Sequence, residues 1–213
     1  MPEYKITYFG LYGRAEMSRM LLAHAKADWE DERLTQEEFG AKKAAGEYPN
    51  GQVPILHHNG KQMNESVAIL RYLGKKLGYY PADDDELCWS ADATIYTAGD
   101  HMTKLMGPIF TKDFSEAACE TWTGVLKTFV GKMDKQLAGH GKKFLCGDKL
   151  TIADFMVAGT IFSSAGNEIS AIPAEWRAKT KEVMGENKAF HAWFDVMKAE
   201  MAEHLANRPP APF

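Results

Sequence analysis

Residues 53–78, VPILHHNGKQMNESVAILRYLGKKLG, contain the pattern that decides the fold. The apolar run at 53–56 and the Asn59-Gly60 pair after it are typical of a β-hairpin, so two short antiparallel strands are expected. Apolar side chains then recur at helical spacing from Glu65 onward, and a glycine stands where the C-cap would be. This stretch therefore predicts a hairpin followed directly by an amphipathic helix.

On the N-terminal side of this stretch, the sequence predicts two strands and two helices in alternation. Residues 3–9, EYKITYF, are rich in β-branched and aromatic side chains, and residues 29–34 give a second strand signal. Apolar side chains have helical spacing at 14–25, and a shorter helix is expected after Thr35, whose hydroxyl suits an N-cap. The first 80 residues therefore predict the order βαβαββα.

After residue 80 the pattern changes. Pro81 and a run of four acidic residues suit an interdomain linker over 81–86. No alternating strand pattern follows, and helical patterns occupy residues 86–112, 116–138, 153–167, 174–185 and 188–206, with breaks expected at Pro108, 139–147, Pro173 and Gly185. The expected fold class is α/β plus all-α, with an α/β domain at 1–80 and an all-helical domain at 87–213.

Composition excludes several classes of function. The 213 residues carry a net charge of −4, so neither nucleic acid nor an anionic membrane surface is an expected partner. The three cysteines form no CxxC pair, which disfavours a disulfide framework or a structural zinc site and fits a reducing compartment. No signal peptide or transmembrane run is visible, so a cytoplasmic location is expected.

Three sets of residues could carry chemistry. The first is Tyr8, which ends the first strand beside a glycine-containing loop, where ligands of open α/β sheets gather. Its phenol is neutral at pH 7 and could donate one hydrogen bond to an anion, whereas half-buried packing is the alternative.

The second set is Val53-Pro54. A cis peptide bond there would turn the amide and carbonyl of Val53 outward to pair with an extended peptide-like ligand, whereas a strand-initiating proline is the alternative.

The third set is Glu65-Ser66 at a helix start, which would suit an amino-acid zwitterion: the helix end and the Ser66 hydroxyl would hold the carboxylate, and Glu65 the amine. Simple helix capping is the alternative.

The order and spacing of these residues resemble the cytosolic glutathione transferases over essentially the whole chain. The features that carry the resemblance are Tyr8 with Arg14, the proline strand at 53–56 and ESVAILRYL at 65–73, followed by an acidic linker and a helical domain. PEYKITYFGLYGRAE at the start is most similar to the sigma class, which includes haematopoietic-type prostaglandin D synthase and the S-crystallins. The resemblance implies a thioredoxin-like N-terminal domain followed by a helical bundle.

A further motif lies in the helical part. FLCGDKLTIADF at 144–155 is similar to the family's helical-domain motif, in which Thr151 and Asp154 form a buried capping box. This similarity concerns folding and not chemistry.

The resemblance implies a site for the tripeptide glutathione. Tyr8 would donate a hydrogen bond to the glutathione sulfur, and Arg14 would polarise both groups. The other implied glutathione-binding positions are Phe39, Lys43, Gln52, Val53, Pro54, Glu65 and Ser66, with Asp100 reaching the glutathione amine across a homodimer. Phe39 replaces the family's usual tryptophan and lacks its indole N–H, and Lys42 could share the charge role of Lys43.

The second substrate implied by the resemblance is a hydrophobic electrophile, in a pocket formed by Leu11, Gly13, Met102, Met156 and Thr160. Two acids of the prostaglandin synthase's metal site align with Tyr96 and Gly99, so neither a metal nor a cofactor beyond glutathione is expected. The expected activity is conjugation of glutathione. The alternatives are a prostaglandin-type glutathione-dependent isomerase and a non-catalytic crystallin-like or ligand-carrier protein.

Overall fold

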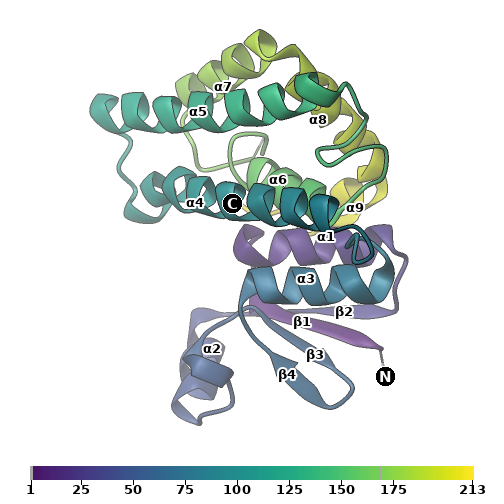
Figure 1. The fold of residues 1–213 in the computed structure, drawn as a ribbon. Coiled ribbons are helices and arrows are strands. Elements are labelled where there is room, and N and C mark those ends of the chain that lie inside the picture. Colours follow the sequence, from purple (N-terminus) through teal and green to yellow (C-terminus); the bar gives the residue numbers. More distant parts are fainter. Residues whose placement is uncertain (1, 168) are drawn as a thin grey trace.

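The computed structural model describes residues 2–167 and 169–213 and contains an α/β half and a helical half (Figure 1). The α/β half consists of β1 (Tyr4–Phe9), α1 (Glu16–His24), β2 (Trp29–Leu34), α2 (Gln36–Ala44), β3 (Ile55–His58), β4 (Lys61–Met63) and α3 (Ser66–Leu77), with 3-10 turns η1 (Gly13–Ala15) and η2 (Pro49–Gly51). This is the predicted βαβαββα order. Thr35 is the N-cap of helix α2, and its hydroxyl accepts from the Glu38 amide, as a capping box requires.

The strands form one mixed sheet in the order β2-β1-β3-β4. β1 pairs in parallel with β2, and β3 runs antiparallel to both β1 and β4. The turn at Asn59-Gly60 has φ values of 49° and 71°, which asparagine and glycine tolerate better than other residues. β3 begins only at Ile55, because Pro54 has no amide hydrogen for the ladder.

The helical half consists of α4 (Asp85–Thr111), α5 (Glu116–His140), α6 (Ile152–Ser163), α7 (Ala174–Glu186), α8 (Lys188–Glu200) and α9 (Ala202–Asn207). The expected break at Pro108 is wrong: this proline lies in the last turn of α4, and the helix ends where Lys112 adopts φ of 55°. The single helix expected at 188–206 is divided at Met201, whose ψ of 10° leaves the helical region. α6 also ends four residues before the predicted 167.

Helix α6 forms the centre of the helical half, and all of its residues are buried. The predicted capping box at its start is confirmed, because Asp154 accepts the Thr151 amide at 2.9 Å and Thr151 accepts the Ala153 amide. Asp154 also accepts from Trp193 of α8. The motif therefore fixes the start of α6 and joins it to α8.

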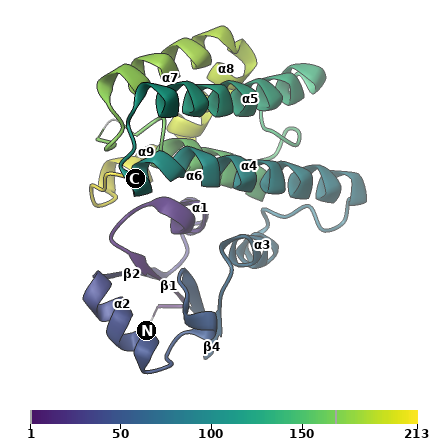
Figure 2. The same ribbon diagram turned by 90° about the vertical axis from the view of Figure 1, so that its left-hand side faces the viewer.

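The two halves pack through α6, α1 and α3. A Cβ at Gly159 of α6 would lie 3.0 Å from the Met17 amide nitrogen of α1, and a Cβ at Gly74 of α3 would overlap the Ile152 side chain. Figures 1 and 2 show α1 and α3 between the sheet and the helical half, with α2 at the far end. Across the described ranges, the helices are too short or too polar to cross a membrane.

Candidate glutathione site

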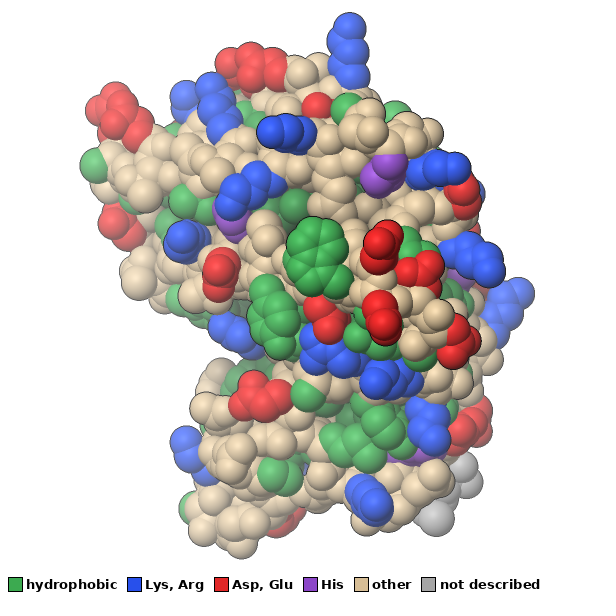
Figure 3. Space-filling view, viewed as in Figure 1, with side chains coloured by type: hydrophobic (Ala, Val, Ile, Leu, Met, Phe, Trp, Pro, Cys, Tyr) green, Lys and Arg blue, Asp and Glu red, His purple; other side chains and the backbone are tan. Residues whose placement is uncertain are grey.

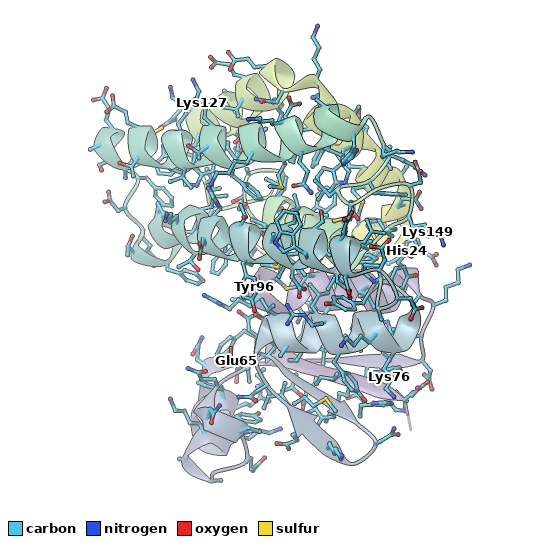
Figure 4. The ribbon with its side chains drawn as sticks, viewed as in Figure 1. His24, Glu65, Lys76, Tyr96, Lys127 and Lys149 are labelled. Atoms are coloured by element: carbon cyan, nitrogen blue, oxygen red, sulfur yellow. The ribbon has the colours of Figure 1, made fainter. Side chains whose placement is uncertain are left out.

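A cleft of about 600 Å³ lies between α2, the segment before β3 and the start of α3. It is lined by Phe9, Arg14, Phe39, Lys43, Gly51, Gln52, Val53, Pro54, Glu65 and Ser66. All of these except Phe9 and Gly51 belong to the predicted glutathione site, so the fold gathers four separate segments into one cleft. Figure 3 shows the surface hollowed between the two halves, on the side where Figure 4 places Glu65. Two larger hollows, of about 980 and 880 Å³, lie along α9 and contain none of the predicted residues.

Tyr8 lies at the end of β1 and is only 6% exposed. Its hydroxyl oxygen accepts the Arg14 amide at 3.4 Å, which leaves the O–H hydrogen for another acceptor. Burial raises the pKa of the Tyr8 phenol, against the lowering effect of the Arg14 amide and the charges of Arg14 and Arg19. The phenol is therefore protonated at pH 7 and can act as a hydrogen-bond donor, not as a base.

Gly13 keeps the space beside this hydroxyl open. Its φ is +43°, and a Cβ there would lie 2.9 Å from the Tyr8 hydroxyl and 3.0 Å from the Leu11 side chain. A larger residue would therefore crowd the tyrosine and strain the turn. Gly13, a predicted residue of the hydrophobic pocket, thus lies beside the Tyr8 hydroxyl.

The Arg14 side chain reaches α4 of the helical half. Its guanidinium donates to the Thr103 hydroxyl of α4 at 3.4 Å, so Arg14 bridges the two halves beside the cleft. Its direct contact with Tyr8 is made by the backbone amide. The predicted polarising role of Arg14 would thus combine an amide hydrogen bond with a nearby positive charge.

Arg19 is a residue that the sequence reasoning missed. It is fully buried in α1, pairs with Asp31 of β2 at 2.8 Å and donates to the Leu11 carbonyl at 2.6 Å. Its guanidinium lies 5.7 Å from the centre of the Tyr8 ring. Arg19 therefore holds the loop between Tyr8 and Arg14 in place through its hydrogen bond to the Leu11 carbonyl. No sequence signal marks Arg19, because its burial depends on an ion pair with Asp31, which lies on strand β2.

The backbone at the middle of the cleft has two unusual features. The Val53–Pro54 peptide bond is cis, which is the geometry that the sequence left open. Glu65 has φ of 68° and ψ of 105°, and it is the N-cap of α3 without a side-chain capping bond. A non-glycine residue with positive φ is strained, and such residues cluster at ligand sites. Neither Glu65 nor Ser66 therefore caps α3 through its side chain.

At the end of the cleft near α2, the positive charge of Lys43 lies against the aromatic ring of Phe39. The Lys43 ammonium lies 5.7 Å from the Phe39 ring, and Phe39 packs against Phe9 at 5.0 Å between ring centres. Lys42 is turned the other way and binds Glu32 at 3.2 Å. Lys43 therefore lines the cleft, whereas Lys42 lies outside its lining and is held in an ion pair.

Some predicted residues are absent from the cleft lining, and Tyr8 is one of them, although its neighbours Phe9 and Arg14 line the cleft. Asp100 is exposed on α4 and lies outside the cleft lining. Figure 4 places Tyr96 of the same helix just above the start of α3. Met156 and Thr160 are at most 2% exposed, and the Thr160 hydroxyl donates to the Met156 carbonyl within α6. Both residues are thus buried within α6, and their place in the hydrophobic pocket stays a prediction.

The remaining predicted pocket residues, Leu11 and Met102, are likewise absent from the cleft lining. Leu11 is half-buried in the loop after β1, and Met102 of α4 is 5% exposed. Among residues 2–167 and 169–213, no three His, Cys, Asp or Glu side chains are grouped closely enough to hold a metal ion.

Known families match this chain in both halves. The family model described as "Glutathione S-transferase, N-terminal domain" matches residues 4–75, and "Glutathione S-transferase, C-terminal domain" matches residues 99–174. Glutathione S-transferase 3 of Caenorhabditis elegans is 32% identical over 176 residues, covering 79% of this chain and 84% of that protein. The chain belongs to the glutathione S-transferase family. It is an enzyme of that family, as the resemblance implied.

Two further comparisons refine the position of this transferase. Human hematopoietic prostaglandin D synthase is 33% identical over 156 residues, covering 73% of this chain and 76% of that protein. The structure of a Nu-class GST from Haemonchus contortus superposes with a TM-score of 0.81 at 27% identity and covers all of both chains. The fold class is therefore confirmed, and sigma-like proteins are among the relatives.

Proposed function

We propose that this transferase binds glutathione in the cleft, stabilises its thiolate through Tyr8 and adds the sulfur to hydrophobic electrophiles. The observation that carries the proposal is the arrangement at Tyr8, whose oxygen accepts the Arg14 amide while its own hydrogen remains available. A hydrogen bond from the phenol to the sulfur favours the thiolate over the thiol. A free thiol has a pKa of ~8.5, and each unit of lowering gives about tenfold more thiolate near neutral pH.

The cleft suits the rest of the tripeptide. The cysteinyl backbone of glutathione would pair with the amide and carbonyl of Val53 as one more short strand. The γ-glutamyl carboxylate would meet the start of α3 and the Ser66 hydroxyl, and its amine would meet Glu65. Lys43 at the opposite end would bind the glycyl carboxylate. The ligand's two carboxylates and one ammonium thus meet groups of complementary charge.

A homodimer of sigma-class type is part of the proposal. Asp100 is exposed on α4, where it would reach the γ-glutamyl amine in a partner's cleft. Replacing Asp100 with asparagine should then raise the KM for glutathione and leave kcat for saturating glutathione nearly unchanged. Sedimentation at assay concentrations should show a dimer. A monomer with full activity would refute this arrangement.

A detoxifying role in the cytoplasm accords with conjugation of hydrophobic electrophiles.

The Tyr8→Phe variant tests the proposal. Conjugation of chlorodinitrobenzene at pH 6.5 should fall roughly 10- to 100-fold, with the KM for glutathione changed little, because only the donor to the sulfur is lost. Tyr4→Phe is a matched control, since Tyr4 is a buried tyrosine on the same strand that stacks on His58, away from the cleft. An unchanged rate in Tyr8→Phe would refute the role of Tyr8.

The similarity to human hematopoietic prostaglandin D synthase supports a second candidate, a glutathione-dependent isomerase. Such an enzyme would convert its substrate without consuming glutathione. A product screen that follows glutathione together with a cyclic endoperoxide substrate separates the two activities. A non-catalytic ligand carrier would instead bind glutathione with negligible turnover in either assay.

A further inference from the structure

Residues 9–12, called the β1–η1 loop below, connect Tyr8 to the 3-10 turn that contains Arg14. This loop lies against the fully buried side chain of Arg19, whose guanidinium donates to three of its four carbonyls. The acceptors are the carbonyls of Leu11 at 2.6 Å and of Phe9 and Tyr12 at 3.4 Å each. One side chain of α1 therefore fixes most of the backbone between the tyrosine and Arg14.

The guanidinium is itself held by carboxylates from two elements. Its Nε donates to Asp31 of β2 at 2.8 Å, and the buried Glu16 carboxylate of α1 lies 3.9 Å from a terminal nitrogen. Arg33 binds the second oxygen of Asp31 at 2.8 Å, and His204 and Arg208 bind Glu16. The two carboxylates thus fix the guanidinium in place and offset its own charge.

The β1–η1 loop determines the surroundings of the Tyr8 hydroxyl. The Arg14 amide, just beyond the loop, donates to this hydroxyl at 3.4 Å. Gly13 also adjoins it, because a Cβ at Gly13 would lie 2.9 Å from the hydroxyl oxygen. The guanidinium that holds the loop lies 5.7 Å from the centre of the Tyr8 ring. The position of the phenol relative to its amide partner therefore depends on the path of the loop.

We propose that Arg19 is a positioning residue for thiolate formation. By holding the loop carbonyls, it sets the direction in which the Tyr8 hydroxyl presents its hydrogen to the glutathione sulfur. Direction matters because a hydrogen bond weakens steeply when its angle is poor. The inference rests on the proposed function, because Arg19 does not line the cleft and acts only through Tyr8.

A lysine in place of Arg19 separates position from charge. Its ammonium keeps the positive charge but has three donors at one point, whereas a guanidinium spreads five N–H groups over a planar fork. The lysine could pair with Asp31 but could not also reach all three loop carbonyls. Arg19→Lys should therefore differ from wild type if position matters, and should match it if only charge matters.

The experiment measures the pKa of the thiol of bound glutathione from the ultraviolet absorbance of the thiolate. In Arg19→Lys this pKa should rise by at least about half a unit, which is about threefold less thiolate near neutral pH. Conjugation of chlorodinitrobenzene at pH 6.5 should lose roughly three- to tenfold in kcat/KM, with the KM for glutathione within about twofold of wild type. An unchanged thiol pKa would overturn the proposal.

Arg33→Lys is the matched control. Arg33 also pairs with Asp31, but in the described part of the chain its guanidinium donates to none of the loop carbonyls. The thiol pKa and kcat/KM of this variant should match wild type. Equal shifts in Arg33→Lys and Arg19→Lys would overturn the proposal, because the effect would then follow from Asp31 and not from the loop.

A double variant tests whether Arg19 acts through Tyr8. In the Tyr8→Phe background, adding Arg19→Lys should move the thiol pKa by less than about 0.3 unit, because the donor that Arg19 positions is already absent. An equal shift in both backgrounds would overturn the route through Tyr8. A purely structural role would lower the urea midpoint of Arg19→Lys and leave the thiol pKa of the folded complex unchanged, which would also overturn the proposal.

Asp31→Asn keeps the test decisive if Arg19→Lys does not fold. This change weakens the anchor of Arg19 and also removes a negative charge beside it. Looser positioning should raise the thiol pKa by at least about 0.3 unit, whereas the added net positive charge alone would lower it. A fall or no change would overturn the proposal.

Failure of the proposed function is distinguishable from failure of this inference. If Tyr8 does not activate the thiol, Tyr8→Phe will keep the wild-type thiol pKa. If Tyr8→Phe raises the thiol pKa while Arg19→Lys and Asp31→Asn keep the wild-type value, only the role of Arg19 is refuted.

Discussion

Replacing Asp154 with alanine should destabilise the protein by several kcal/mol. The carboxylate is fully buried and accepts the amides of Leu145 and Thr151 and the indole N–H of Trp193, each at 2.9 Å. Alanine would leave these three donors in the core without an acceptor. Each unsatisfied donor costs about 1–3 kcal/mol, so the expected loss is about 3–6 kcal/mol after partial relaxation. The free energy of unfolding of a folded domain is only ~5–15 kcal/mol, so this substitution should remove a large part of the stability.

Urea unfolding followed by tryptophan fluorescence measures this loss by linear extrapolation. The control is Asp148→Ala, which removes an exposed carboxylate paired with Lys142 at 2.9 Å and should cost no more than about 1 kcal/mol. A loss below about 1 kcal/mol for Asp154→Ala, or equal losses for the two variants, would show that the capping box does not hold α6 in place.

Three further predictions concern pH, packing and ligand charge. Burial raises the pKa of Glu16, but its hydrogen bond and ion pairs outweigh burial and hold it at about 2 instead of 4.5. The ionised Glu16 therefore adds about 3 kcal/mol to the free energy of unfolding above pH ~4.5, and this contribution is lost as the pH falls toward 2. The difference in free energy of unfolding between wild type and Glu16→Gln should then disappear in acid, and a difference that stays constant with pH would contradict this. Gly159→Ala should cost about 1–3 kcal/mol in urea unfolding, because its methyl meets the Met17 backbone; a stabilised variant would refute that contact. Lys43→Met should raise the KM for glutathione roughly tenfold, whereas Lys42→Met should change it little; equal effects would remove Lys43 from the ligand.

Much of the α/β half could be predicted because its signals are local. Strands and helices follow from side-chain periodicity, and the hairpin follows from two turn residues. The cleft could be predicted from the family resemblance, which joins positions such as Lys43 and Ser66 that lie far apart in the sequence. Arg19 could not, because its burial is decided by Asp31 on a neighbouring strand. The strain at Glu65 likewise depends on how the chain enters α3.

The helical half was less predictable in detail. Pro108 lies in the last turn of α4, where a missing amide disturbs the helix too little to end it at that point. α6 is buried on every face and mostly apolar, so no periodic signal tells which of its residues, such as Met156 and Thr160, would reach a pocket. The contact between Tyr12 and Phe213 joins opposite ends of the sequence and has no local signal.

The pKa of the thiol of bound glutathione is the most direct test of Tyr8 as the activating donor. It is measured by titrating the ultraviolet absorbance of the thiolate in the binary complex of wild type and of Tyr8→Phe. The wild-type complex should titrate at least about one unit below the ~8.5 of a free thiol, and Tyr8→Phe should return the pKa close to that value. Equal thiol pKa values in the two complexes would contradict the account.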